Sequence, residues 1–161
     1  MDKPVRKITK GFIMAAGRGT RFLPYSKVMP KTMLLVDGEP LVVRNTKLLD
    51  AALDLDTIYI VVGYKAKLIR EALGQVKNLK ARLEFIALSP EQIEKGLLAG
   101  FAAILPYLSE DESFVSVLGD EYYGGLDHPA FAKFIQSAGD FGVCCGVKNT
   151  IFRMNILTTI P

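Results

Sequence analysis

Short apolar runs alternate along this chain with segments whose apolar residues have helical spacing. The runs are apolar on both faces, which is typical of strands buried inside a parallel sheet. Strands are predicted at 10–16, 57–63, 82–88, 113–120 and 141–147, with a short extended segment at 32–38. Helices are predicted at 41–55, 65–74, 91–108 and 128–139. This alternation predicts an α/β fold, a Rossmann-like three-layer α/β/α arrangement with a mainly parallel (mixed) sheet.

The length of 161 residues suits one domain over 1–161, with 1–7 as a flexible tail and 148–161 as an atypical, truncated-looking end. No apolar stretch is long enough to span a bilayer, so we expect a cytoplasmic protein with no membrane partner. An exposed edge on the last strand would favour self-association into a homo-oligomer.

Charge and cysteine content exclude several function classes. The net charge of +3 is mild, and we expect no nucleic-acid partner. Cys144 and Cys145 are adjacent and lie in no metal-ligand pattern. The one histidine, His128, precedes Pro129 at a predicted helix start and is interpreted as a surface residue.

The loop after the first predicted strand reads "GRGTR" at 17–21. Gly17 and Gly19 allow a sharp turn and a close approach of backbone N–H groups to an anion. Thr20 adds a hydroxyl, and Arg21 adds a planar cation suited to phosphate oxygens. The alternative is a tight turn without a ligand. The spacing is not that of a P-loop, and Phe22 stands where a dinucleotide fingerprint has its third glycine, which disfavours a dehydrogenase.

Two further charged residues are candidates for chemistry. Pro30 stiffens the chain before Lys31 and could aim its ammonium group, although a plain surface lysine is the alternative. Asp120 ends the apolar run "FVSVLG" and could hold Mg²⁺ together with substrate phosphates. A loop-capping aspartate is the alternative for Asp120, and Glu121 is a second ligand or only a neighbour.

The predicted helix at 91–108 is unusually rich in small residues. Gly96, Ala99 and Gly100 leave one face nearly bare, for close packing on the sheet or for a nucleobase. Gln92 offers a donor and an acceptor to the edge of a base.

Together, the segments "MAAGRGTRFLPYSKVMPKTMLLVDGEPLV", "EKGLLAGFAA" and "VLGDEYY" resemble the sugar-phosphate nucleotidyltransferases, the nucleoside-diphosphate-sugar pyrophosphorylases. The resemblance implies the nucleotide-diphospho-sugar transferase type of fold. It implies catalytic roles for Arg21 on the leaving pyrophosphate, Lys31 on the α-phosphate and Asp120 on Mg²⁺, the expected cofactor. It implies that the nucleotide is bound by Ala15, Ala16, Gly17, Arg18, Gly19, Thr20, Arg21, Gln92, Gly96 and Gly119.

The implied activity transfers a nucleoside monophosphate from an NTP, with a pyrimidine base expected, to a sugar 1-phosphate or similar acceptor, and releases pyrophosphate. Members of the family are usually longer, and this chain has no carboxylate after Asp140 to act as a second metal ligand. Two alternatives therefore stay open beside a truncated product. The chain is a minimal enzyme that uses Glu121 or solvent, or it is a non-catalytic nucleotide-binding module that acts with a partner chain.

Overall fold

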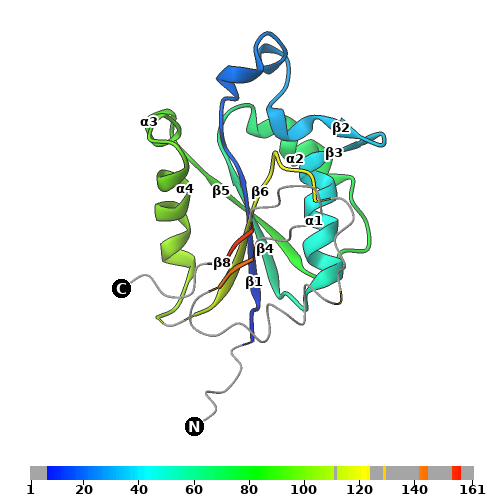
Figure 1. Ribbon diagram of the computed structural model, residues 1–161, viewed down its shortest axis with the longest axis vertical. Helices are drawn as coiled ribbons and strands as arrows, with labels where there is room; N and C mark the ends of the chain where they lie inside the picture. The colour runs from blue at the N-terminus through cyan, green and yellow to red at the C-terminus, as the bar shows by residue number, and fades with distance from the viewer. Residues whose placement is uncertain (1–6, 111, 124–128, 130–141, 145–153, 157–161) are drawn as a thin grey trace.

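A computed structural model describes residues 7–110, 112–123, 129, 142–144 and 154–156 of this chain. Its centre is a six-stranded sheet with the order β5-β4-β1-β6-β8-β7 (Figure 1). Four strands are parallel: β1 (Lys10–Ala15), β4 (Thr57–Val62), β5 (Arg82–Ala87) and β6 (Phe114–Leu118). The strand β8 (Met154–Ile156) runs antiparallel to both β6 and β7 (Gly142–Cys144). The predicted mainly parallel, mixed sheet is confirmed.

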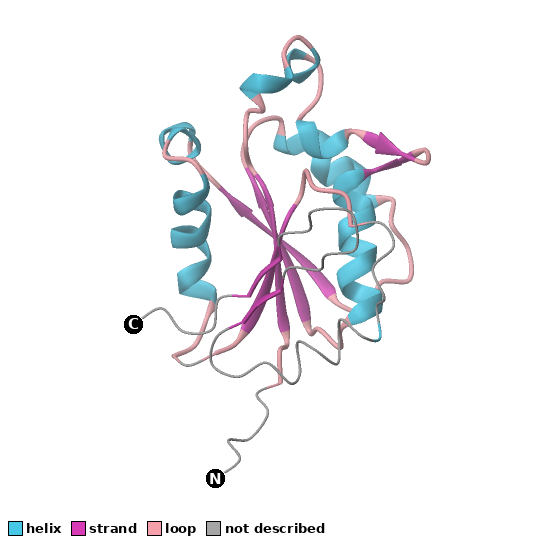
Figure 2. Ribbon diagram, in the orientation of Figure 1, coloured by secondary structure: helices cyan, strands magenta, loops and turns pink. Residues whose placement is uncertain are grey.

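Helices cover both faces of the sheet (Figure 2). The helices α1 (Leu41–Ala52) and α2 (Ala66–Gly74) lie on one face, and α3 (Pro90–Glu94) and α4 (Leu97–Ile104) lie on the other. The three-layer prediction is therefore confirmed. Within the described residues, no helix has the length and apolar character needed to cross a membrane.

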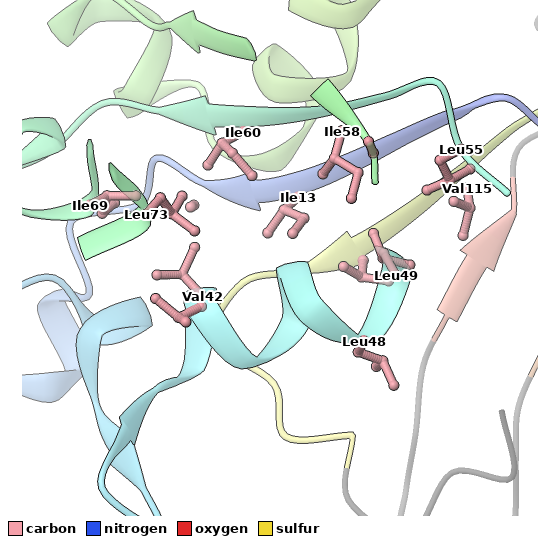
Figure 3. Packing of buried hydrophobic residues seen from close by; sticks show 14 of the residues in the cluster. Ile13, Val42, Leu48, Leu49, Leu55, Ile58, Ile60, Ile69, Leu73 and Val115 are labelled. Carbon is pink, nitrogen blue, oxygen red and sulfur yellow. The ribbon is translucent and has the colours of Figure 1, made fainter. Parts of the chain in front are cut away.

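Alternate residues of the strands build two separate cores, because successive side chains point to opposite faces. On one face, Ile13 and Ile60 pack with Val42 of α1 and their neighbours (Figure 3). On the other face, Phe12 stacks on Tyr59 with ring centroids 5.0 Å apart. Both faces of β1 are thus buried, as the apolar run predicted.

Two predicted segments are wrong in detail. The helix predicted at 91–108 is two helices, because Gly96 has φ 73° and breaks the helix between α3 and α4. It then ends in a 3-10 turn, η4 (Leu105–Tyr107). The extended segment predicted at 32–38 is a 3-10 turn, η3 (Lys31–Met33), followed by a hairpin of β2 (Leu35–Val36) and β3 (Glu39–Pro40).

The far end of the chain is described only in part. The strand β8 lies in the segment that sequence patterns left without an assignment, and β7 lies within the strand predicted at 141–147. The helix predicted at 128–139 lies outside the described residues except for Pro129, and His128 and Cys145 also lie outside them.

The strand order reverses next to β1, and this positions the site. After β1 the chain continues to β4 on one side of it, whereas β6 lies on the other side. The loops that leave the carboxyl ends of β1 and β6 lie beside this switch in strand order and line one cavity, and open α/β sheets bind ligands at such a place. The segments after these two strands contain most of the predicted site residues, and Gln92 and Gly96 follow β5.

Candidate active site

A cavity of about 200 Å³ lies at the carboxyl edge of the sheet. Apolar side chains make most of its wall, including Met14 of β1, Val61 of β4 and Leu97 of α4. Its charged and polar lining is small: Lys31, Thr32 and Asp120. An apolar pocket with a few convergent polar groups is the usual form of a small-molecule site.

The glycine loop (residues 17–21) forms one lip of this cavity, to which Gly17 and Gly19 contribute. Gly19 has left-handed angles (φ 63°, ψ 44°) and begins the 3-10 turn η1 (Thr20–Phe22). A Cβ atom built on Gly17 meets nothing within 4 Å, so packing of the protein alone does not require a glycine there. The start of the loop is held by Tyr64, whose backbone N–H donates to the Ala16 carbonyl over 3.1 Å.

Lys31 and Asp120, 89 positions apart in sequence, meet in the cavity wall. The Lys31 ammonium nitrogen lies 2.7 Å from the Asp120 Oδ2 atom. Pro30 is extended (φ −68°, ψ 150°) and delivers Lys31 to the start of η3, which carries the ammonium group toward the end of β6. Both side chains are part-exposed, at 44% for Lys31 and 32% for Asp120, so an incoming ligand can reach them.

Asp120 sits in a short turn at the end of β6, which we call the aspartate turn (residues 118–121). The backbone N–H of Glu121 lies 3.5 Å from the Leu118 carbonyl, a weak closure. Asn45 of α1 donates from its Nδ2 to both end carbonyls, over 3.1 Å to Leu118 and 3.0 Å to Glu121. Side chains from outside the turn therefore hold it.

Tyr123 also holds this turn. Its hydroxyl accepts the Leu118 N–H at 3.2 Å and donates to the Glu121 carboxylate at 3.1 Å. Burial, together with the nearby negative charges of Glu121 and Asp120, raises the pKa of the Tyr123 phenol above its ordinary value. The hydroxyl thus stays protonated and available as a donor at neutral pH.

Several small residues serve packing. The Gly119 N–H donates to the Met14 carbonyl over 2.9 Å, and a Cβ at Gly119 would lie 3.0 Å from that same oxygen. A Cβ at Gly100 would lie 3.2 Å from the Met14 sulfur. Gly96 lines the cavity, as Gly100 does, but it has open space beside it and a backbone conformation that L side chains rarely adopt.

Only some of the site residues predicted from the sequence line the cavity. Ala15, Ala16, Gly17, Gly19, Gly96, Lys31 and Asp120 line it. Other side chains lie outside this lining. Arg18 pairs with Glu94 of α3 at 3.0 Å, while Thr20 and Arg21 are exposed. Gln92 closes a capping box with Ser89, in which its Oε1 accepts the Ser89 N–H over 2.8 Å.

Sequence reasoning missed Asn45, Tyr123 and Thr32. Asn45 had a recognisable signal, since it is a polar residue at a position that the helical pattern assigns to the buried face. Thr32 is 5% exposed, and its hydroxyl oxygen has no hydrogen-bond partner among the described residues.

The donor chemistry of the cavity suits a hard cation with one protein carboxylate. Among the described residues, no group of three or more His, Cys, Asp or Glu side chains could hold a metal, and Asp120 is the one carboxylate in the cavity wall. Mg²⁺ commonly uses one or two carboxylates and takes its other ligands from water and substrate phosphates. Asp120 fits that pattern, whereas the Glu121 carboxylate is hydrogen-bonded to Tyr123.

Comparison with known proteins gives independent evidence about the family of this chain. The sequence model of the family described as "Nucleotidyl transferase" matches residues 10–151. The chain is 30% identical over 156 residues to UTP–glucose-1-phosphate uridylyltransferase 2 of Staphylococcus saprophyticus, covering 86% of this chain and 53% of the relative. It is 31% identical over 120 residues to 2-aminoethylphosphonate cytidylyltransferase of Lancefieldella rimae, covering 71% of this chain and 46% of the relative.

A solved structure supports the same fold. The crystal structure of UDP-glucose pyrophosphorylase complexed with UDP-glucose superimposes with a TM-score of 0.63 at 18% identity, over 94% of this chain and 74% of that chain. The chain spans about half the length of the curated relatives just named. Since the family match runs from β1 past β7, through both loops of the cavity, the chain belongs to the nucleotidyl transferase family.

Proposed function

We propose that this chain carries the nucleotide-binding part of a Mg²⁺-dependent nucleotidyltransferase, which transfers NMP from an NTP to a sugar 1-phosphate or a similar phosphorylated acceptor. The observation that carries this proposal is the Lys31–Asp120 pair, 2.7 Å apart in the wall of an apolar cavity beside the glycine loop. A cation and a carboxylate so placed are what a site needs when it brings two phosphate groups together.

In the proposed reaction, a phosphate oxygen of the acceptor forms a bond to the α-phosphorus of the NTP. The bond between that phosphorus and the oxygen bridging to the β-phosphate breaks, and pyrophosphate leaves with the electron pair. The acceptor phosphate is already anionic, so no general base is needed. Catalysis then rests on in-line positioning and on cations placed where negative charge develops.

The chain's own groups divide this work. Gly17 and Gly19 line the cavity, and their backbone N–H groups would bind the nucleotide, while Lys31 would neutralise the α-phosphate during attack. Arg21, the last residue of this loop, is exposed and would bind the leaving pyrophosphate. Asp120 would hold Mg²⁺, which when bound supplies charge neutralisation at the phosphates.

The nucleobase would lie between the glycine loop and α4, where Gly96 has open space beside it. The Gln92 amide oxygen caps α3, so reading of the base by Gln92 would use its NH₂ group or require the capping box to open. A pyrimidine base remains our proposal, and the acceptor is a sugar 1-phosphate or a related phosphorylated compound. A cytoplasmic location goes with it, because nucleoside triphosphates are held inside cells. Self-association is a further proposal, since β5 and β7 end the described sheet.

The test is release of pyrophosphate from ATP, GTP, CTP and UTP, each with Mg²⁺ and a panel of sugar 1-phosphates and aminoalkyl phosphonates. We expect turnover with one pyrimidine NTP and one acceptor class, and loss of turnover in Asp120→Ala. NTP binding without turnover for any pair would instead support the alternative, a nucleotide-binding module that acts with a partner chain. An absence of NTP binding would overturn both.

A further inference from the structure

Asn45 lies fully inside the protein at the junction of α1 and β6. It is 1% exposed, and its side-chain amide faces the main chain of another element. An uncharged amide buried in this way costs free energy unless it is hydrogen-bonded. Its Nδ2 meets that requirement through two carbonyls that lie 73 and 76 positions further along the chain. No regular element needs these bonds, because α1 and β6 have their own backbone ladders.

The two acceptors are the first and last residues of the aspartate turn. Leu118 and Glu121 flank Gly119 and Asp120, and the turn's own closing contact is long at 3.5 Å. Asn45 therefore spans the turn and ties both ends to α1 over 3.1 and 3.0 Å. The backbone that carries Asp120 is then held by α1 and by the Gly119 N–H bond to the Met14 carbonyl, and not by the weak turn contact alone.

Neighbouring groups support the same turn from two more directions. The Tyr123 hydroxyl accepts the Leu118 N–H. The guanidinium of Arg44, next to Asn45 on α1, lies 5.3 Å from the centre of the Tyr122 ring, and its Nη2 lies 3.4 Å from Asp37 in the hairpin turn. The segment around Asp120 is thus held on both sides of the carboxylate.

We propose that Asn45, assisted by Tyr123, is a positioning residue: it holds the aspartate turn so that the Asp120 carboxylate meets Lys31 and is ready for a cation and a phosphate. The proposal rests on the proposed function for its consequences in binding and rate. The hydrogen bonds from Asn45 to the turn are present in the protein without any ligand. Residues that orient a ligand residue in this way typically affect metal affinity or activity by about 10–100-fold.

The first experiment needs no ligand. Amide hydrogen exchange, followed by mass spectrometry, compares the wild type with Asn45→Leu, which keeps the branched shape and the number of side-chain heavy atoms and removes the Nδ2 donor of both hydrogen bonds. We expect exchange at residues 119–121 to be roughly five- to tenfold faster, the factor that about one lost hydrogen bond implies. The matched control is Thr46→Val, a fully buried position on the same helix whose hydroxyl donates to Val42 within α1. Unchanged exchange at 119–121, or the same change in the control, would overturn the proposal.

The second experiment measures UTP binding by calorimetry with and without Mg²⁺. In Asn45→Leu we expect the Mg²⁺-dependent gain in UTP affinity to fall by about 10–100-fold, with the Mg²⁺-free affinity changed by less than about threefold. In an Asp120→Ala background, Asn45→Leu should add nothing, because the group that it positions is gone. Independent, additive losses from the two changes would show a merely structural role and sink the inference.

Two outcomes keep the inference separate from the proposed function. If the wild type binds UTP or another of the four NTPs, the calorimetry uses the NTP that binds, and the exchange result still decides on Asn45. If it binds none of the four, the proposed function fails while the exchange result decides in the same way. If Asn45→Leu does not fold, Tyr123→Phe removes the assisting hydroxyl and keeps the ring. Faster exchange at 119–121 in Tyr123→Phe would support the proposal, and unchanged exchange there would contradict it.

Discussion

The glycine loop and the aspartate turn leave the same edge of the sheet, from adjacent strands, yet they are built in opposite ways. The glycine loop has open space beside Gly17, and within the described part of the chain Arg21 has no hydrogen bond or ion pair. The aspartate turn is tied to Asn45, Tyr123 and Lys31, and its Gly119 is packed against β1. The glycine loop is thus open to a ligand, whereas the aspartate turn is already held by contacts within the protein.

This difference has a physical reason. Backbone N–H groups that are to bind a phosphate must not already be satisfied by the protein. A carboxylate and an ammonium group that stabilise developing charge are most effective when they are oriented in advance, because no reorganisation is then needed during reaction. The comparison therefore predicts that changes in the turn act through stability and rate, whereas changes in the loop act through nucleotide binding.

The largest effect is expected from Lys31→Ala, which removes the cation that joins the turn to the cavity. We expect turnover to fall by about 10²–10³-fold, as on loss of other electrostatic stabilisers. Lys27→Ala is the matched control, because Lys27 is an exposed lysine four residues earlier in the same segment. The measurement is steady-state pyrophosphate release, and turnover in Lys31→Ala within threefold of the wild type would contradict the assignment.

Next in size is the contrast between two glycines. Gly119→Ala would bring a Cβ to 3.0 Å from the Met14 carbonyl oxygen, and backbone cannot easily move away. We expect this overpacking to lower the free energy of unfolding in urea by about 1–3 kcal/mol. Gly17→Ala meets open space, so its stability should stay within about 0.5 kcal/mol of the wild type while nucleotide affinity falls. Equal stability losses in both variants would break the comparison between loop and turn.

A substitution at Gly96 tests the part of the cavity wall that lies between α3 and α4. Its angles (φ 73°, ψ −153°) lie in a region that only glycine populates readily, so Gly96→Ala should cost about 1–3 kcal/mol through backbone strain. Gly74→Ala is the control, since Gly74 ends α2 with open space around it and without a positive φ. That change should stabilise the protein by about 0.4–1 kcal/mol. Urea unfolding compares the two, and a stable Gly96→Ala protein would contradict this strain argument.

The smallest expected effect is a loss of unfolding free energy at alkaline pH through Tyr123. Because burial raises the pKa of Tyr123 in the folded protein, the unfolded chain releases the phenolic proton at lower pH than the folded one. The stability from this hydroxyl is complete below about pH 10 and is lost as the pH rises above it, by less than about 1.4 kcal/mol per pH unit. Tyr123→Phe should lack this component. Parallel pH profiles of unfolding free energy for both proteins between pH 8 and 11 would argue against it.

Much of the fold could be predicted because the signals are local. The apolar run of β1, the helical spacing of α2 and the Asp37–Gly38 turn each depend on a few neighbouring residues. The break at Gly96 could not be predicted in this way. The apolar spacing on its two sides is continuous, and a single glycine in a helical pattern is compatible with an unbroken helix as well as with a break.

By itself, the sequence determined the alternating elements, the glycine loop, Lys31 after the stiff Pro30, and Asp120 at a strand end. The tertiary structure alone decided that these two charges pair, that Gly119 is a packing residue while Gly17 is open, and that Asn45 holds the turn between them. The physical reason is separation along the chain. Periodicity and turn chemistry act over a few residues, whereas contacts across 73 to 89 positions exist only after the sheet and its helices have packed.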